Sequence, residues 1–251
     1  MRKYSFLLAM FFLTTLTFGQ DVRDTQYDDW QFTLAPYLLM ASVSGDAAIA
    51  VDNRSEVDLK FGDLLKNLQF AFMMRGEVYK GNWGVMADYV YLKLGDDIDT
   101  PEEVVADIEF RQSIFEFFVS RRIRHDWGWI DVYGGIRHWG FGIDLNLEGL
   151  GLTRVSFKEN WVDPVVGGRA VLQFSDRFTA IFRGDIGGFG AGSDFSFTVQ
   201  PGVGYHFSNW FAVMLQYKYL YVDYNNDKSA PDLFIYDAAT NGPLLGFVFQ
   251  F

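Results

Sequence analysis

The sequence predicts an all-β chain: a transmembrane, antiparallel, up-and-down β-barrel of about ten strands, with eight or twelve strands as alternatives. Three observations predict this fold. The chain begins with a short apolar stretch typical of secreted proteins, and hydrophobic residues then alternate with polar ones at a period of two. The alternating segments are also longer than the 5–6 residues or so usual in soluble strands. Because every backbone N–H and C=O must be paired within lipid, a strand-rich chain crosses a membrane only as a closed barrel.

Composition excludes several classes of protein. Of 251 residues, 18% are aromatic and 49% are hydrophobic, which is incompatible with a disordered chain. The net charge of −11 argues against a nucleic-acid partner, because phosphates would be repelled. The absence of cysteine excludes disulfides, thiolate metal sites and cysteine nucleophiles. We also expect no cofactor.

The N-terminus has the features of a cleavable secretory signal over residues 1–20. Arg2 and Lys3 are positively charged, and 13 mostly apolar residues follow from Phe6 to Phe18. This run is too short for a membrane-spanning helix, which needs about 20 residues. We therefore expect a signal peptide at 1–20, a short periplasmic segment at 21–29, and a barrel at 30–251.

Ten segments after the signal alternate between apolar and polar residues. Most contain ten or more residues, enough for a tilted strand of about 9–11 residues to cross a bilayer. The predicted strands are 30–40, 69–79, 83–94, 108–122, 129–144, 161–174, 178–187, 193–207, 210–223 and 235–251.

The connections between these segments are alternately short and mostly longer. Bacterial outer-membrane barrels have short periplasmic turns and longer extracellular loops. The sequence therefore predicts that both chain ends and the short turns face the periplasm. The short turns are 80–82, 124–126, 175–177 and 208–209.

Tryptophans gather at the predicted short-turn end. Trp83, Trp127, Trp129 and Trp210 follow short turns, and Trp30 begins the first strand. Amphipathic indole rings are enriched at membrane–water interfaces. We expect these five side chains to form one girdle at the periplasmic interface.

The mature chain resembles bacterial outer-membrane β-barrel proteins in its signal, its strand pattern and its terminal Phe251. Trp161–Arg169, Arg183–Gly190 and Ser193–Phe195 are similar to stretches of a porin-like family with largely uncharacterised members, and Phe18–Gln20 is similar to signal ends of Bacteroidetes proteins. The resemblance implies the outer membrane of a Gram-negative bacterium. It also implies contact with membrane lipid and lipopolysaccharide, and recognition of Phe251 as a signal by the barrel-assembly machinery.

The polar face of the strands predicts a charged lumen. A ring of charged side chains can select solutes in a channel. The alternative is a structural ion-pair network, which we favour because a barrel of about ten strands has little interior space and buried charges must be paired. The predicted lumenal residues are Arg75, Glu77, Asp88, Glu116, Asp131, Arg137, Asp163, Arg169, Arg183, Asp185 and Lys218.

The first connection, residues 41–68, is unusually long. Three leucines at helical spacing, preceded by an aspartate that can cap, predict a short helix at its end. We expect this loop to fold inward and narrow or plug the lumen. The alternative is an additional hairpin with strands at 47–51 and 56–61, which would raise the strand count to twelve. The candidate plug residues are Asp63, Leu64, Leu65 and Leu68.

These features predict a porin-like protein forming a narrow or plugged pore for small solutes or ions. The alternative is a non-conducting structural or surface-interaction barrel that contacts lipopolysaccharide or a partner. An outer-membrane enzyme is the least favoured class. His125, His138 and His206 do not fall beside a serine and a carboxylate as in a catalytic triad. We therefore expect neither a catalytic residue nor a metal site.

Overall fold

The computed structural model describes residues 29–99, 105–148 and 155–251, so the predicted signal at 1–20 and nearly all of 21–29 lie outside it. No helix in the described part has the length and apolar character needed to cross a membrane. The elements are β1 (Trp30–Leu39), β2 (Ser42–Ile49), β3 (Ser55–Leu59), α1 (Phe61–Lys66), β4 (Leu68–Lys80), β5 (Trp83–Asp99), β6 (Val105–His125), β7 (Gly128–Glu148), β8 (Val155–Gln173), β9 (Phe178–Gly188), β10 (Phe195–His206), β11 (Phe211–Asn225) and β12 (Phe234–Gln250).

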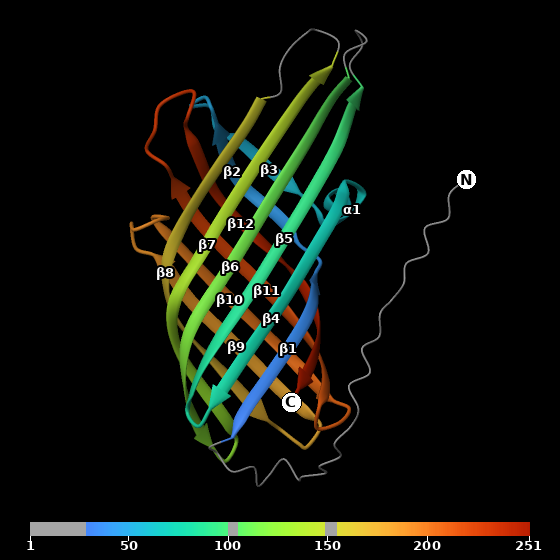
Figure 1. Ribbon diagram of the computed structural model, residues 1–251, viewed down its shortest axis with the longest axis vertical. Coiled ribbons are helices and arrows are strands. Elements are labelled where there is room, and N and C mark those ends of the chain that lie inside the picture. Colours follow the sequence, from blue (N-terminus) through green and yellow to red (C-terminus); the bar gives the residue numbers. More distant parts are fainter. Residues whose placement is uncertain (1–28, 100–104, 149–154) are drawn as a thin grey trace, which may run out of the picture.

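Ten strands, β1 and β4 to β12, form a closed antiparallel barrel (Figure 1). Each strand pairs with the next along the chain, and β12 closes the ring by pairing with both β11 and β1. Phe249, for example, is the register partner of Leu34 on one side and of Phe211 on the other. The predicted ten-stranded barrel is therefore confirmed, and the alternative of eight strands is wrong.

Side chains alternate between the outer surface and the interior along each wall strand. On β9, Phe178, Phe182 and Ile186 are exposed, whereas Arg183 and Asp185 between them are buried. An apolar exterior and a polar interior are the pattern expected of a barrel in lipid. The hydrophobic face thus points outward, the reverse of a soluble protein.

The strands β5 to β8 are much longer than a membrane requires. They contain 17, 21, 21 and 19 residues. At about 3.3 Å per residue a strand of this length extends for roughly 60–70 Å, whereas about 9–11 residues suffice to cross a bilayer. The excess lies at the end opposite the C-terminus (Figure 1). We call these two ends the long-loop end and the short-turn end.

The segment 41–68 differs from the inward loop that we expected. Residues 42–59 form the hairpin β2–β3, in which β2 pairs with β12 just beyond the place where β1 leaves it. The backbone groups of this segment are thus satisfied by the sheet, which continues the wall. The hairpin was our alternative, but both of its strands begin and end earlier in the sequence than the predicted 47–51 and 56–61. The two strands add to the sheet without enlarging the ten-stranded ring.

The predicted plug residues lie after this hairpin. Leu64 and Leu65 are in α1, where Leu64 is buried and Leu65 is 54% exposed, and Leu68 begins β4. Asp63 pairs with Lys66 at the helix surface at 3.8 Å. Within the segment, Val43, Ala47 and Ile49 of β2 pack against the aromatic cluster that fills the interior. The main filling comes instead from the barrel strands.

Four of the five predicted girdle tryptophans lie on the outer surface near the short-turn end. They are the exposed residues Trp30, Trp83, Trp127 and Trp210. The prediction for Trp129 is wrong, because Trp129 lies on the same side of β7 as the buried residues of the lumen, and the Arg122 guanidinium lies 4.8 Å from its ring centroid. Trp129 lies two residues before Asp131 in β7, so the alternation that placed Asp131 in the lumen also turns Trp129 inward.

A second aromatic belt lies further along the outer surface, toward the long-loop end. Ring contacts there join neighbouring strands, at 6.2 Å between Phe72 and Tyr89 and 6.5 Å between Tyr89 and Phe115. On the other side of the barrel, Phe197 and Tyr219 stack at 5.6 Å. Two aromatic belts separated by an aliphatic band are typical of barrels that span a bilayer.

Candidate functional site: the packed lumen

The lumen contains all eleven charged residues that the sequence placed there. All of them are buried except Arg75 and Arg169, whose side chains are 12% and 11% exposed. Nine of the eleven form ion pairs with one another. Most of them belong to three groups, described below.

The central group is a closed ring of two arginines and two carboxylates. Arg137 contacts Glu116 at 2.7 Å and Asp185 at 2.6 Å. Arg183 contacts the same two acids at 2.8 and 3.0 Å. Each charge therefore has two partners of opposite sign. This pairing offsets the cost of burying four ions in a water-poor interior. The hydroxyl of Tyr133 donates to Asp185 and accepts from Arg183.

A second group lies closer to the short-turn end. Arg169 makes contacts with both oxygens of Glu77, at 2.5 and 2.8 Å, and with Asp131 at 2.7 Å. Asp131 also accepts two hydrogen bonds from Arg122. Arg122 was not among the predicted lumenal residues, although it lies an even number of residues from Glu116 and therefore on the same side of β6. Its guanidinium lies 3.8 Å from the ring centroid of Tyr79.

The third group joins β4, β5 and β1. Arg75 donates to Asp88 at 2.8 Å, and the Tyr37 hydroxyl donates to the other Asp88 oxygen at 2.6 Å. Lys218 reaches the interior from β11, is 2% exposed, and interacts electrostatically with Glu116 and Asp88.

Asp163 corrects one part of the predicted network, because its partners in the described residues are hydrogen-bond donors and not cations. It accepts from the indole of Trp139 at 2.9 Å, from the backbone N–H and the hydroxyl of Ser193, and from Ser196. Ser193 belongs to the connection between β9 and β10, where Gly188 has a φ of +89° that favours glycine. Asp163 thus fastens this connection to the barrel interior.

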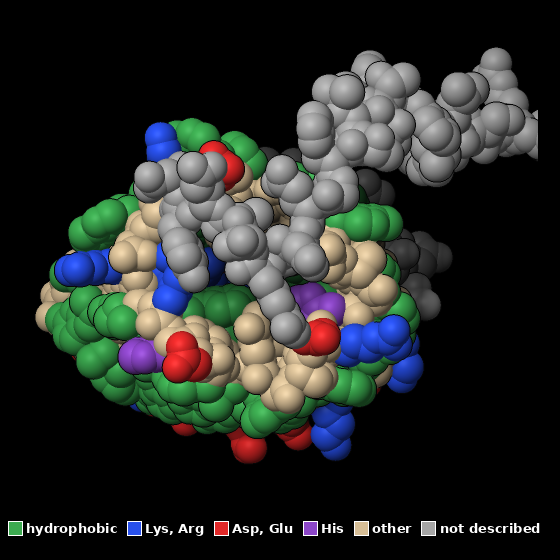
Figure 2. Space-filling view, turned by 90° about the horizontal axis from the view of Figure 1, so that it is seen from below, with side chains coloured by type: hydrophobic (Ala, Val, Ile, Leu, Met, Phe, Trp, Pro, Cys, Tyr) green, Lys and Arg blue, Asp and Glu red, His purple; other side chains and the backbone are tan. Residues whose placement is uncertain are grey.

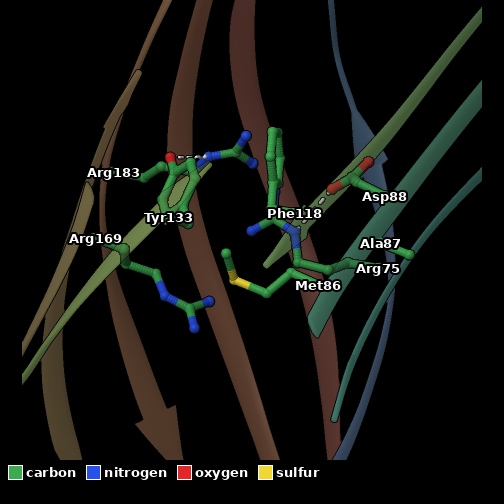
Figure 3. Close-up of a pocket in the computed structure, with 8 residues that line it drawn as sticks. All are labelled: Arg75, Met86, Ala87, Asp88, Phe118, Tyr133, Arg169 and Arg183. Carbon is green, nitrogen blue, oxygen red and sulfur yellow. Dashed lines mark hydrogen bonds and ion pairs between the residues drawn. The ribbon is translucent and has the colours of Figure 1, made fainter. Parts of the chain in front are cut away.

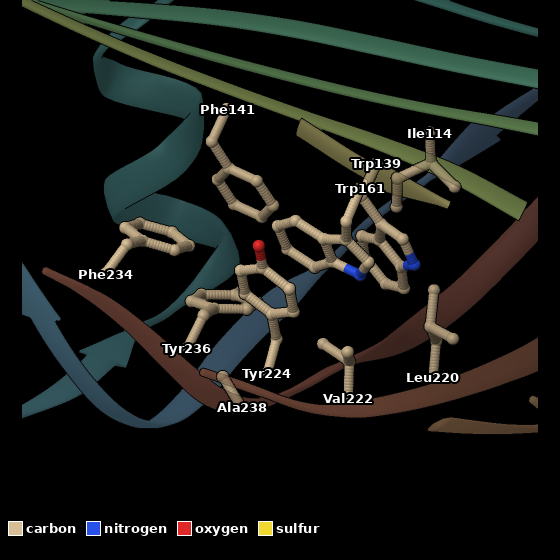
Figure 4. Packing of buried hydrophobic residues seen from close by; sticks show 10 residues of the cluster. All are labelled: Ile114, Trp139, Phe141, Trp161, Leu220, Val222, Tyr224, Phe234, Tyr236 and Ala238. Carbon is tan, nitrogen blue, oxygen red and sulfur yellow. The ribbon is translucent and has the colours of Figure 1, made fainter. Parts of the chain in front are cut away.

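Large aromatic rings fill the lumen toward the long-loop end (Figure 4). Trp161 and Tyr224 stack with ring centroids 3.7 Å apart and planes 3° apart, and Phe141 stacks on Trp161 at 5.4 Å. Sequence analysis missed this cluster, although Trp161 alternates with Asp163 and therefore shares its face. The cluster consists of Ile114, Trp139, Phe141, Trp161, Leu220, Val222, Tyr224, Phe234, Tyr236 and Ala238.

A very small cavity lies between the charged groups (Figure 3). It has about 10 Å³ of room for the centre of a water molecule, which is at the lower limit for one water. Arg75, Arg169 and Arg183 line it together with Phe118 and Tyr133. Ion pairs and aromatic rings thus surround this small space on several sides.

No protein-family model and no curated protein sequence matches the chain. Solved structures do match, among them the outer membrane protease OmpT from Escherichia coli, with a TM-score of 0.61, 9% identity, and coverage of 89% of this chain and 97% of OmpT. The chain has the fold of a bacterial outer-membrane β-barrel. The Ail protein of Yersinia pestis (TM-score 0.40, 11% identity, 88% and 98% coverage) and the translocator domain of NalP from Neisseria meningitidis (0.38, 12%, 89% and 89%) are more distant.

The charges in the interior of this outer-membrane-type barrel nearly cancel. With Arg122 included, the three charged groups and Asp163 contain six acids and six bases, and Glu159, further along the lumen, pairs with the half-exposed Lys228 at 3.7 Å. Within the described residues, no group of three or more acidic or histidine side chains is arranged to hold a metal ion. In the charged groups described above, the side chains bind one another.

Proposed function

We propose that this chain is a non-conducting β-barrel of the outer membrane of a Gram-negative bacterium, with its role at the cell surface. The observation that carries the proposal is the packed lumen. A ring of four charges blocks the middle of the barrel, and stacked indole and phenyl rings fill the part above it. The sequence favoured a narrow or plugged pore, and the observed packing instead supports the non-conducting alternative.

The parts available for an external role are at the long-loop end. The strands β5 to β8 extend well beyond the outer aromatic belt, and the hairpin β2–β3 stands outside the closed ring. In the described sheet β3 is an edge strand that pairs with β2 alone, and most of its residues are exposed. An unpaired strand edge can accept an additional strand from another chain. Contact with lipopolysaccharide or a surface partner through this region is part of the proposal.

A catalytic role is not part of the proposal. Of the three histidines, His125 ends β6 and His206 ends β10, both at the short-turn end, while His138 lies on the outer face of β7. None of them therefore lies at the long-loop mouth, where a substrate from outside would arrive. OmpT is a protease, but at 9% identity its likeness to this chain concerns the fold alone.

Conductance of the refolded protein in a planar lipid bilayer tests the proposal. We expect the wild-type chain to insert without discrete conductance steps. A matched variant carries Trp139→Ala, Trp161→Ala, Glu116→Ala and Arg137→Ala. The first two changes remove rings from the aromatic cluster, and the last two remove one acid and one base from the central charged ring. Arg183 and Asp185 keep each other as partners in this variant.

The variant should give small discrete steps, because it removes filling from both layers at once. Recovery of heat-modifiable protein from the membrane confirms that both chains inserted. Discrete steps from the wild-type chain, of a size similar to those of the variant, would overturn the proposal in favour of a pore.

The surface role has a separate test in whole cells. Glu56→Lys with Asp58→Lys changes the exposed edge strand β3, and Asp126→Lys with Asp176→Lys makes the same change of charge in two short turns. We expect adhesion to protein-coated surfaces to fall only in the β3 variant, with envelope permeability unchanged in both. Equal adhesion of the two variants and the wild type would contradict a role for this strand.

A further inference from the structure

A lateral row of alternating indoles and cations crosses the outer wall at the short-turn end. Trp30 is the register partner of Lys80, Lys80 of Trp83, and Trp83 of Arg121. All four side chains are exposed on the outer surface. Positively charged side chains stand at the margin of this end of the molecule when it is viewed from below (Figure 2). The row lies at the depth of the first tryptophan belt, where a membrane changes from headgroups to acyl chains.

The two cations of this row are held against the rings beside them. The Lys80 Nζ lies 5.3 Å from the ring centroid of Trp30, and the Arg121 guanidinium carbon lies 5.7 Å from that of Trp83. Contacts of this kind orient a cation without neutralising its charge. Among the described residues no carboxylate forms an ion pair with either cation, so both remain available to an anion.

An apolar groove begins directly above the row. It has a volume of about 340 Å³, within the range of small-ligand sites. The groove exists because Gly76 and its register partner Ala87 are small where their neighbours are large. A Cβ atom added to Gly76 would meet no atom within 4 Å, so the space above this residue is open. The lining residues include Phe32, Leu34, Val78, Val85, Ala87 and Phe251.

We propose that this face of the barrel binds one anionic phospholipid of the leaflet at the short-turn end. Lys80 and Arg121 take the phosphate of the headgroup, Trp30 and Trp83 pack at its glycerol level, and an acyl chain occupies the groove over Gly76 and Ala87. The cations and the groove lie in the order that a phospholipid needs. Lys80 is four residues from Gly76 along β4, toward the short-turn end, so the cations are nearer to the headgroups than the floor of the groove. A negative headgroup and an apolar chain are the two chemical features that this surface complements.

Charge decides between this occupant and a second copy of the chain. A dimer formed across this face would bring Lys80 and Arg121 against cations of the same kind, and like charges in contact disfavour binding. A phospholipid brings the opposite sign to the same place. The proposal concerns the outer wall only and holds whether or not the lumen conducts.

Native mass spectrometry of the refolded protein, released from detergent micelles, measures retained lipid directly. The probes are palmitoyl-oleoyl phosphatidylglycerol and palmitoyl-oleoyl phosphatidylcholine, which have identical acyl chains and differ in net charge. We expect the wild-type chain to retain one phosphatidylglycerol molecule, with about tenfold or greater preference over phosphatidylcholine.

Two variants separate the headgroup from the chain. Lys80→Gln with Arg121→Gln should abolish the preference for phosphatidylglycerol, and Arg177→Gln, in a short turn elsewhere on the same end, should leave it unchanged. Gly76→Leu fills the groove and should reduce retention of both lipids. Its matched control is Gly134→Leu, since an added Cβ at Gly134 meets its nearest atom at an ordinary 3.6 Å.

Heat-modifiable migration shows that each variant has folded, so a loss of lipid is not a loss of structure. Equal retention of the two lipids by the wild type, or retention of neither, would overturn the proposal. So would unchanged retention in the Gly76→Leu variant. A dimer mass that disappears in that variant would assign the groove to a second copy of the chain instead.

Discussion

Arg137 is fully enclosed, at 0% exposure, and it holds two carboxylates from different strands. Its guanidinium is planar and carries five donors, so it can serve Glu116 and Asp185 together with the hydroxyls of Ser196 and Thr198. A lysine with one ammonium group could not reach all of these acceptors. The centre of the lumen therefore depends on this residue type as well as on its charge.

Replacing Arg137 by alanine should lower the free energy of unfolding by about 3–5 kcal/mol, because Glu116 and Asp185 lose a partner in a buried position. Urea-dependent unfolding in lipid vesicles, followed by heat-modifiable migration, measures this change. Arg177→Ala is the control: its side chain is exposed in a short turn, and a change within about 0.5 kcal/mol is expected. Similar losses in both variants would contradict a network centred on Arg137.

The lumenal charges could be predicted one residue at a time because the strand period is two. Once one residue of a strand is known to face inward, every second residue follows, and Arg75 to Lys218 were located in this way. The same rule would have found Arg122, Trp139 and Trp161. Trp139 and Trp161 were missed because polarity was taken as the sign of an inward position, whereas in this barrel the rings that fill the lumen are as apolar as the outer wall. Arg122 was left out although it is charged, at the last position of the predicted strand 108–122.

At the scale of elements, the helix α1 joins the hairpin β2–β3 to β4 and presents two different faces. Leu64 is buried and Leu65, the next residue, is 54% exposed. The periodicity of the leucines predicted the helix but not what surrounds it. Which side of a surface helix is covered depends on contacts between distant segments, and sequence spacing alone does not contain them.

Labelling with a bulky maleimide on whole cells tests this orientation. Leu65→Cys should react freely because its side chain points to solvent, and Leu64→Cys should react slowly because its side chain is covered. The chain has no other cysteine, so each label reports one position. Rapid labelling of both positions would show that α1 is not docked, and labelling of neither would place the helix inside the mouth, as the sequence first suggested.

At the scale of the whole molecule, the barrel has two populations of tryptophan. Trp30, Trp83, Trp127 and Trp210 are on the outer wall near one end, whereas Trp129, Trp139 and Trp161 face the interior. Neither population shares an environment with the other, because the sheet separates them. This separation makes the inside and outside of the barrel distinguishable by fluorescence.

Lipids with brominated acyl chains should quench only the outer population, because bromine must approach the indole closely. We expect part of the emission to persist in fully brominated vesicles. This remaining fluorescence should disappear when Trp129, Trp139 and Trp161 are all replaced by Phe. Complete quenching of the wild-type protein would mean that the interior rings are accessible to lipid and that the wall is not closed.

The fold was more predictable than the local departures from it. Alternation, strand length and short turns located all ten wall strands, because these depend on single residues and their neighbours. The path of residues 41–68 was not predicted correctly, since the choice between a loop and a hairpin depended on whether β12 had a free edge beyond β1. Trp129 was assigned to the outer girdle because it follows a short turn, although it shares the parity of Asp131 and therefore its face of β7.

The last residue of the chain has a consequence for how the molecule forms. Phe251, with a side chain that is 76% exposed, exchanges two backbone hydrogen bonds with Phe32, at 3.0 and 2.9 Å. The first and last strands of the described sheet, β1 and β12, thus make the seam, and a chain without either strand cannot complete it. Until β12 pairs with β1, the sheet has two unpaired strand edges, so ring closure is a late step that completes the barrel at once. A chain that stops before β12 therefore forms an open sheet and not a smaller barrel, and its unpaired strand edges can pair with those of other chains.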